Sequence, residues 1–388
     1  MVPHRGHSAG FVSWKFCTYG NSIVLPIMNL RIPGPTPLPQ PVLDAMHRQI
    51  INHRGEESKQ LIKTVSTTVQ TLCGTSGDIY LMTASGWGGV ESAIINTITP
   101  SDTVLCLSAG YFGEEFGRIA SVFGANVETQ VFPDGAIIDP DAVATQLRNM
   151  KNVKAVLVTH NESFTGVAHP LRDIAAAVRA NSDALLHVDA VSATGAMETQ
   201  MEAWGIDTIC TASQKALMGS PGIALVAVSE RAWQASTHCK NPRFCYDWTP
   251  YHEHFKEYDT PTTAAITLIY GLAAAAELIL AEGIPSVYAR HERVAAFTRE
   301  RVRGLGLELF ANADGYSPTL TAIRMPEGIS SDEVRTLARE HGVEFGASWS
   351  RLQGKVLRIG HMGMTSEADI DDAVEVLGDV VAHLRGRM

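Results

Sequence analysis

The sequence predicts an α/β fold with a large domain, built on a mostly parallel seven-stranded sheet, and a smaller C-terminal α+β domain. Two observations lead to this prediction. Between about residues 78 and 229, short apolar runs alternate with helical stretches, which is typical of a parallel sheet covered by helices on both faces. After about residue 280, long helices come first and strands follow, which indicates a second unit of mixed structure.

Seven runs of the large domain are apolar along nearly their whole length, as strands buried on both faces should be. They cover residues 78–85, 103–108, 126–132, 153–160, 183–190, 207–213 and 222–229. Helical stretches separate most of them, at residues 89–98, 116–124, 141–150 and 171–180.

The C-terminal part has its own order of elements. Two long helices at 260–283 and 286–304 come before strands at 320–326, 343–348 and 355–363, with further helices at 331–341 and 367–385. We therefore divide the chain into a large cofactor-binding domain at 28–280, with an N-terminal arm at 28–50, and a small domain at 281–388. Residues 1–27 lack this periodicity, and we expect an N-terminal extension that is a candidate for disorder rather than a signal peptide.

Composition excludes several classes of function. A formal net charge of −10 argues against nucleic acid as a partner, and we find no long apolar run that predicts a membrane span. The six cysteines include no Cys-x-x-Cys pair, and two of them fall in apolar strands. We therefore expect a cytoplasmic protein with reduced thiols and no metal site.

Polar residues follow several of the predicted strands. Parallel sheets bind ligands at the carboxyl ends of their strands, so we expect these residues to meet in one crevice. They are Ser85, Gly86, Trp87, Ser108, His160, Asn161, Glu162, Ser163, Asp189, Ser213, Gln214 and Lys215.

The run ASGWGG at 84–89 leads into a predicted helix. A glycine-rich turn at a helix N-terminus offers free N–H groups to a phosphate, although such turns often have no ligand. Asp189 ends a buried strand, where it either caps the next helix or needs a cationic partner. Lys215 at another strand end is either a solvated loop lysine or a reactive amine.

Together these features meet the needs of pyridoxal 5′-phosphate. The cofactor needs a lysine for its aldehyde, an acid beside its pyridine nitrogen and N–H groups for its phosphate. The order of phosphate loop, Asp189 and Lys215 along the chain is more specific than any one of them.

Over residues 28–385 the sequence resembles the class V aminotransferases of the alanine–glyoxylate and serine–pyruvate group, which have the aspartate-aminotransferase-like fold type I. The motifs that carry this resemblance are PGPT (33–36), NHRG (52–55), SGWGGVESA (85–93), GYFGEEFG (110–117), THNESFTG (159–166), VDAVSATGA (188–196), WGIDTICTASQKAL (204–217) and LRIGHMG (357–363).

The resemblance implies a role for each matching residue. Lys215 matches the lysine that forms the Schiff base and moves the proton, and Asp189 matches the partner of the ring nitrogen. Arg358 matches the arginine that binds the substrate carboxylate. The remaining matches are cofactor-binding: Ser85, Gly86, Trp87 and Gln214 around the phosphate, Ser163 near the phenolic oxygen, Phe112 and Val191 on the two ring faces, and Thr263 toward the phosphate of a neighbouring subunit.

The sequence departs from the family pattern at four positions. Trp87 stands where a smaller residue is frequent, so its side chain could narrow the site. Thr260 and Ala264 replace a frequent tyrosine and proline, which weakens the match of Thr263. Asn161 replaces a frequent glycine.

The resemblance implies a ping-pong transaminase. It would move an amino group from alanine or serine to glyoxylate or pyruvate, in a homodimer with shared active sites, with no nucleic acid or membrane partner. Sister enzymes acting on ureidoglycine, 2-aminoethylphosphonate or pyridoxamine remain alternatives, as does an inactive relative that serves as a binding subunit. A cysteine desulfurase is disfavoured, because no cysteine follows Cys245.

Three further residues are left with two interpretations each. His361 could line the substrate entrance or be a satisfied core histidine, and we favour the core. His53 and Arg54 could be structural or face the site.

Overall fold

The computed structural model describes residues 17–19, 22–24 and 28–387. Strands β1 (Cys17–Tyr19) and β2 (Ser22–Val24) pair in antiparallel fashion. The rest of the extension at 1–27, for which we expected disorder, lies outside the described residues.

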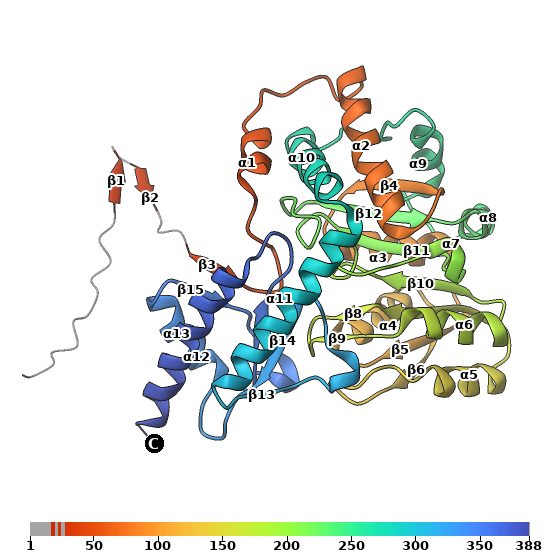
Figure 1. Cartoon of the computed structure of the whole chain (residues 1–388). Coiled ribbons are helices and arrows are strands. Elements are labelled where there is room, and N and C mark those ends of the chain that lie inside the picture. Colours follow the sequence, from red (N-terminus) through yellow and green to blue (C-terminus); the bar gives the residue numbers. More distant parts are fainter. Residues whose placement is uncertain (1–16, 20–21, 25–27, 388) are drawn as a thin grey trace, which may run out of the picture.

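The large domain contains one seven-stranded sheet, as the sequence predicted. Its order is β4-β12-β11-β10-β7-β5-β6, running from top to bottom on the right-hand side of Figure 1. Of the seven strands, only β12 runs in the opposite direction to the other six. The strands are β4 (Asp78–Thr83), β5 (Thr103–Ser108), β6 (Asn126–Val131), β7 (Val153–Thr159), β10 (Leu185–Asp189), β11 (Thr208–Ala212) and β12 (Ile223–Val228).

Two apolar cores cover the two faces of this sheet. Successive strand residues belong to alternate cores, as with Leu225 and Val226 of β12, because side chains alternate across a strand. One core includes α2 (Glu56–Cys73), α5 (Pro140–Asn149), α6 (Leu171–Asn181) and α10 (Ile266–Glu282). The other includes α3 (Gly86–Thr97), α4 (Tyr111–Val122), α8 (Glu230–His238) and α9 (Trp248–Phe255).

The sequence prediction of these helices was incomplete. It omitted α2, α8 and α9, and it began α3 and α4 several residues too late. The long helix expected at 260–283 begins only at Ile266, so residues 260–265 precede α10. Short helices α1 (Gln40–Met46) and α7 (Met201–Trp204) complete this domain.

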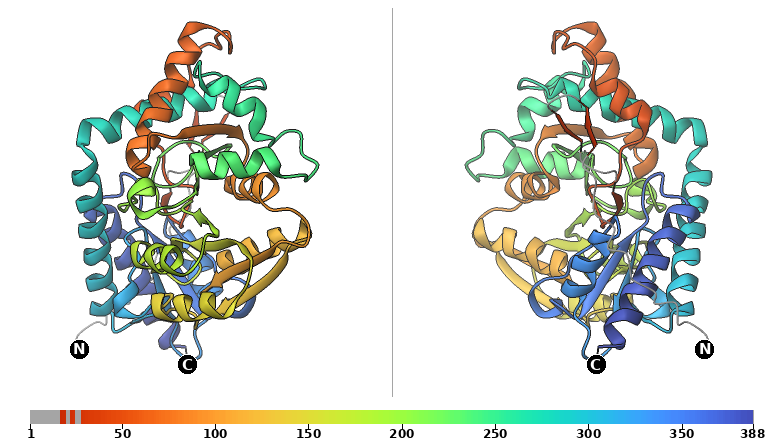
Figure 2. Two further views of the ribbon diagram at one scale, coloured as in Figure 1. Left: turned by 90° about the vertical axis from the view of Figure 1, so that its right-hand side faces the viewer. Right: turned by 90° about the vertical axis from the view of Figure 1, so that its left-hand side faces the viewer.

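The C-terminal part is a second unit of α+β type, as predicted, with its own core. Strands β13 (Glu308–Leu309), β14 (Leu320–Arg324) and β16 (Val356–Gly360) form an antiparallel sheet. Helices α11 (Ile284–Gly304), α12 (Ser331–Glu340) and α13 (Glu367–Arg385) pack beside it, and Figure 2 shows α11 running along one side of the molecule. Strand β15 (Val343–Phe345) pairs with β3 (Asn29–Arg31), so the start of the N-terminal arm lies with the C-terminal residues.

Helices α10 and α11 meet at an angle of 90°, close to the domain boundary that we placed at residue 280. Within the described residues, no single helix is long and apolar enough to cross a membrane, and only this bent pair has the combined length and apolar composition for it. Much of α10 is buried in the core beneath the large sheet.

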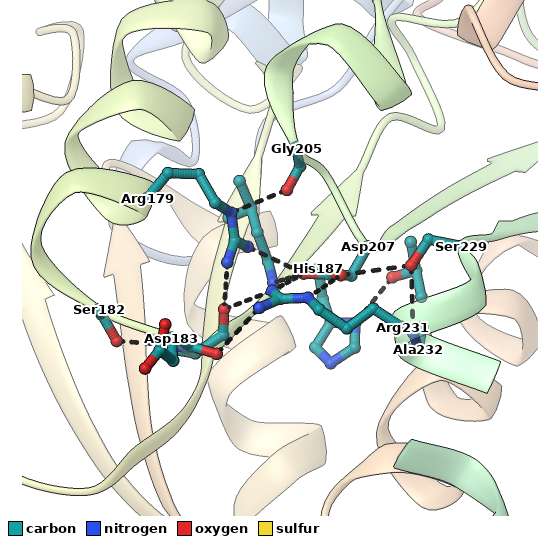
Figure 3. Close-up of polar contacts among 12 residues, drawn as sticks. Arg179, Ser182, Asp183, His187, Gly205, Asp207, Ser229, Arg231 and Ala232 are labelled. Carbon is teal, nitrogen blue, oxygen red and sulfur yellow. Dashed lines mark hydrogen bonds and ion pairs between the residues drawn. The ribbon is translucent and has the colours of Figure 1, made fainter. Parts of the chain in front are cut away.

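A charged cluster fixes the amino ends of β10 and β11 (Figure 3). Asp207 is buried and accepts hydrogen bonds from Arg179 at 2.9 Å, from Arg231 at 2.6 Å and from the backbone N–H of Leu186 at 2.7 Å. Next to it, the ring of His187 lies between two threonine hydroxyls. A buried carboxylate with two guanidinium partners is compensated, so this cluster holds the end of the sheet opposite to Asp189.

Candidate active site

The predicted site residues gather at the carboxyl ends of the sheet strands. Asp189 ends β10, Lys215 follows β11, and residues 85–87 link β4 to α3. Phe112 lies in the first turn of α4, after β5. Ser163 follows β8 (Asn161–Glu162), a short strand just beyond β7. The sheet topology therefore brings together segments that are far apart in the sequence.

Lys215 is partly buried, and its amine donates a hydrogen bond to the carbonyl oxygen of Pro33. The backbone of Gly34 lies against the same side chain, because a Cβ atom there would be 2.7 Å from the Lys215 Nζ atom. Burial and, to a smaller extent, nearby Arg358 together lower the pKa of Lys215 to about 8, and Asp189 opposes the shift. A lysine with this pKa has an appreciable fraction of free amine near neutral pH, which a nucleophile or base requires.

Asp189 is only 5% exposed, and its Oδ1 atom accepts one hydrogen bond from the backbone N–H of Val191 at 3.0 Å. Burial raises the pKa of Asp189 to about 6, while the hydrogen bond and Lys215 lower it. Among the described residues, the Oδ2 atom has no hydrogen-bond partner. This carboxylate is therefore incompletely compensated and suited to a further cationic N–H group.

The N-terminus of α3 is open and lies close to Val191. A Cβ atom on Gly86 would be 2.8 Å from the Val191 Cγ2 atom, so only glycine allows this approach. Ser85 occupies the N-cap position, but its side chain makes no capping hydrogen bond. The first N–H groups of this helix can therefore serve an anion. Gln214 lies beside Lys215, with its backbone carbonyl bound to the N–H of Thr36 at 3.1 Å.

Phe112 belongs to a group of aromatic rings. The Trp87 ring stacks on it, with centroids 5.7 Å apart and an interplanar angle of 21°. Trp87 is 37% exposed, so its ring is a partly solvent-facing wall. The side chain that could narrow the site thus lies against the predicted stacking residue.

Arg358 is buried, and its guanidinium has three hydrogen bonds to backbone carbonyls. The Nη1 atom donates to Ser163 at 2.8 Å, the Nε atom donates to Ala347 at 2.9 Å, and the Nη2 atom also donates to Ala347. Burial lowers the pKa of Arg358 to about 10, and Glu162 opposes this shift. Since a guanidinium has five N–H groups, two remain for a carboxylate.

Two residues at the site had no assigned role in the sequence. Glu162 is fully buried, and it accepts hydrogen bonds from the backbone N–H groups of Phe112, Gly113 and Phe164 at 3.0–3.1 Å. The Trp349 ring lies 4.7 Å from the Arg358 Cζ atom. Glu162 was predicted to lie at a strand end, but no local pattern in the sequence marked Trp349.

The residues with two interpretations are partly resolved. Both ring nitrogens of His361 have partners, Thr321 at 3.0 Å and the Pro318 carbonyl at 3.2 Å, so His361 is a satisfied core histidine. Arg54 is structural, because it bonds to Asp259 at 2.8 Å and to the Thr260 carbonyl at 2.6 Å. No contact decides the role of His53, for which both interpretations stay open.

The structure also shows the contacts of two other residues that depart from the family pattern, Asn161 and Thr260. The Asn161 side chain donates to the hydroxyls of Ser192 and Thr319, both at 2.9 Å, so it joins the large domain to the small one. Thr260 is buried, and its hydroxyl donates to the Thr262 carbonyl at 2.9 Å. Thr263 is exposed. Its role toward a neighbouring subunit stays a prediction.

The donor set fits pyridoxal 5′-phosphate. The free oxygen of buried Asp189 suits a protonated ring nitrogen, and the open start of α3 suits a phosphate. Lys215, with its lowered pKa, suits an aldehyde. These are three separate groups, and each matches one part of the cofactor.

Comparison with known proteins supports this reading. The model of the family described as aminotransferase class-V matches residues 28–371. An L-aspartate–glyoxylate aminotransferase from Paracoccus denitrificans is 36% identical over 91% of this chain and 91% of its own. A protein named soluble hydrogenase, small subunit, from a Synechococcus strain is 34% identical over 92% of this chain and 93% of its own.

A solved structure shares the whole architecture. The crystal structure of an alanine–glyoxylate aminotransferase from a Nostoc species covers 94% of this chain and 97% of its own, with a TM-score of 0.88 and 28% identity. The α/β architecture with a large, mostly parallel sheet is thus that of fold type I. The site, the fold and the family match agree, and the chain belongs to the class V aminotransferases, which are pyridoxal-phosphate-dependent transaminases.

Proposed function

We propose that this transaminase moves an amino group from alanine or serine to glyoxylate or pyruvate. The observation that carries the proposal is the buried guanidinium of Arg358, which has two N–H groups left for one carboxylate and an aromatic ring against it. A site with one carboxylate anchor and aromatic walls suits a substrate with a compact, uncharged side chain. Two of the similar proteins described above are named for glyoxylate, which supports this acceptor.

Each residue has a defined task in this proposal. Pyridoxal phosphate supplies an aldehyde that takes up the amino group and a ring that withdraws electrons from the substrate α-carbon. Arg358 binds the substrate carboxylate and so orients the α-carbon. The free amine of Lys215 removes the α-proton and later returns a proton, as general base and then acid.

Other residues would hold the cofactor. Asp189 would face the ring nitrogen, with Phe112 and Val191 on the two ring faces and Ser163 near the phenolic oxygen. Ser85, Gly86, Trp87 and Gln214 would surround the phosphate, at the open N-terminus of α3.

We also propose a homodimer in the cytoplasm, with shared active sites. Arg54 fixes the segment 259–261 through Asp259 and two backbone carbonyls, and Thr263 is exposed just beyond it. A rigid segment that ends in an exposed hydroxyl can serve a site on a second subunit. Cys73, Cys106 and Cys210 are buried thiols without a disulfide in the described part of the chain, which fits a reducing compartment.

A half-reaction screen tests the function. Protein loaded with pyridoxal phosphate is mixed with single amino acids, and the change in visible absorbance of the bound cofactor is followed. Alanine or serine should convert the cofactor, and glyoxylate or pyruvate should reverse the change. Conversion only by ureidoglycine, 2-aminoethylphosphonate or pyridoxamine would assign a sister activity. Loaded protein that converts no amine would contradict the transaminase and favour a binding subunit.

A further inference from the structure

The loop at 346–352 carries an aromatic ring to the substrate-binding arginine. It forms the first part of the connection between β15 and β16 and contains the short helical turn η2 (Ser350–Leu352). The Trp349 ring packs on the Arg358 guanidinium, with 4.7 Å between the Cζ atom and the ring centroid. The carbonyl of Ala347, in the same loop, accepts two of the guanidinium hydrogen bonds. The same loop therefore contacts the Arg358 guanidinium in two ways: the Ala347 carbonyl binds its N–H edge, and the Trp349 ring packs on its flat face.

The same ring lies among the aromatic residues of the large domain. Trp349 is 5.2 Å from the Tyr111 ring in an edge-on arrangement, 5.2 Å from the Phe164 ring and 6.3 Å from the Phe112 ring. Edge-to-face pairs at such distances are favourable and orient the rings. Trp349 therefore lies between the Arg358 guanidinium on one side and the aromatic rings of the large domain, including the predicted stacking residue Phe112, on the other.

Arg351 anchors this loop to the large domain. It forms two parallel hydrogen bonds to Asp134, at 2.6 and 2.7 Å, and a third to Glu114 of α4 at 3.0 Å. Its side chain is 38% exposed, so a single ion pair there would contribute little. Arg351, however, binds the Asp134 carboxylate with two parallel hydrogen bonds and the Glu114 carboxylate with a third. Such a network fixes the orientation of the guanidinium more precisely than a single ion pair does.

The backbone conformation at Ser350 also indicates that this loop is held in one position. Ser350, between Trp349 and Arg351, has a φ of 51°, a conformation that residues other than glycine rarely adopt. Such a backbone persists only when its surroundings determine it. Here the neighbours on both sides are held, Trp349 by the aromatic rings and Arg351 by two carboxylates.

The geometry points to Trp349 as a specificity-determining residue that positions Arg358 and limits the size of the amino-donor side chain, with Arg351 as the anchor of its loop. This inference rests on the proposed function, in which Arg358 binds the substrate carboxylate. Neither residue is among those that the sequence marked for the site.

The first test measures binding, which does not require turnover. Glyoxylate is titrated into the cofactor-free and the loaded protein by calorimetry, for the native chain, Trp349→Ala, Trp349→Phe and Arg351→Ala. Loss of the ring over the guanidinium should weaken glyoxylate binding by about three- to tenfold in Trp349→Ala. Trp349→Phe should recover part of this loss, and Arg351→Ala should show a smaller loss in the same direction. The control is Arg293→Ala, which removes another surface ion pair of the small domain and should bind normally.

The second test measures donor size by half-reaction rates with alanine, serine, leucine and phenylalanine. Trp349→Ala should raise the kcat/KM ratio of phenylalanine to alanine by roughly tenfold or more, because a side chain that bounds the site is removed. A merely structural role would lower the thermal midpoint and leave this ratio unchanged. Native affinity for glyoxylate together with an unchanged ratio in Trp349→Ala would overturn the inference. If the native protein converts no donor, the proposed function fails, and the binding series still decides whether Trp349 positions Arg358.

Discussion

The carboxylate of Glu162 accepts a hydrogen bond from the backbone N–H of Phe112, with 3.0 Å between the atoms, although the two residues are 50 positions apart. The same carboxylate binds the N–H groups of Gly113 and Phe164. An anion at the start of α4 also interacts favourably with the positive end of that helix. Burial, with a contribution from the charge of Asp189, nevertheless raises the pKa of Glu162 to about 7, and the three backbone hydrogen bonds oppose this rise. Glu162, at the end of β8, thus fixes the backbone of two aromatic residues of the site, Phe112 and Phe164.

Glu162→Gln should loosen this arrangement. The amide has one acceptor oxygen instead of two and brings an NH₂ group against backbone donors. We expect a loss of about 1–3 kcal/mol in the free energy of unfolding, together with weaker binding of pyridoxal phosphate. Urea unfolding and cofactor titration measure the two effects. Glu128→Gln, on the exposed edge strand β6, is the control and should change neither. Native cofactor affinity in Glu162→Gln would show that Phe112 is positioned without this carboxylate.

Asp189→Asn should stabilise the cofactor-free protein while abolishing transamination. Burial raises the pKa of Asp189 from 3.8 to about 6, so the folded state binds a proton that the unfolded state releases between these two pH values. The contribution of this group to stability therefore falls as pH rises from 3.8 to 6 and stays low above that range. The asparagine can keep the hydrogen bond to Val191 without the charge. At pH 7.5 we expect a gain of about 1–3 kcal/mol.

Urea unfolding of the cofactor-free variant at pH 4 and pH 7.5 checks this sign. The gain should be small at pH 4 and large at pH 7.5. An equal or lower stability at pH 7.5 would mean that Lys215 compensates the carboxylate more fully than we infer. Transamination by loaded Asp189→Asn at the native rate would contradict the role of Asp189 in the reaction.

Gly34→Ala should slow the half-reaction as well as lower the stability of the fold. Gly34 has a φ of 108°, and a Cβ atom would lie 2.7 Å from the Nζ atom of Lys215. Gly306 offers a matched control, since its φ is 69° and nothing lies within 4 Å of an added Cβ. Both variants should lose about 1–2 kcal/mol of stability from the strained backbone. Only Gly34→Ala should also slow the half-reaction, and equal half-reaction rates in the two variants would contradict the proposed contact.

Asp207→Asn should be the most destabilising of these changes without a direct effect on chemistry. The variant removes the buried carboxylate that forms ion pairs with both Arg179 and Arg231 in the cluster of Figure 3, at the end of the sheet opposite to Asp189. Removing one partner of a buried ion cluster costs about 3–5 kcal/mol. Thermal unfolding measures the loss, and the rate per folded molecule should stay native. A stable variant with an altered rate would link this cluster to the site.

The sequence predicted the sheet well, because all of its strands except the polar edge strand β6 are mainly apolar runs of five to seven residues, and such runs are a local signal. It missed α2 even though Ile62, Val65, Val69 and Leu72 recur at helical spacing and are buried. The signal for α2 was therefore present in the sequence. The sequence held no local signal for the pairing of β3 with β15, because that pairing joins residues more than 300 positions apart.

The sequence by itself determined the fold class and the order of the candidate residues, since Asp189 and Lys215 stand at the ends of predicted strands in the order that pyridoxal phosphate requires. Their electrostatic state was decided by the tertiary structure, because burial raises the pKa of Asp189, whereas burial and the charge of Arg358 lower the pKa of Lys215. The same holds for Glu162 and Trp349. A carboxylate or an indole becomes part of a site only when folding brings distant backbone donors or a guanidinium against it, and no local pattern in the chain records that contact.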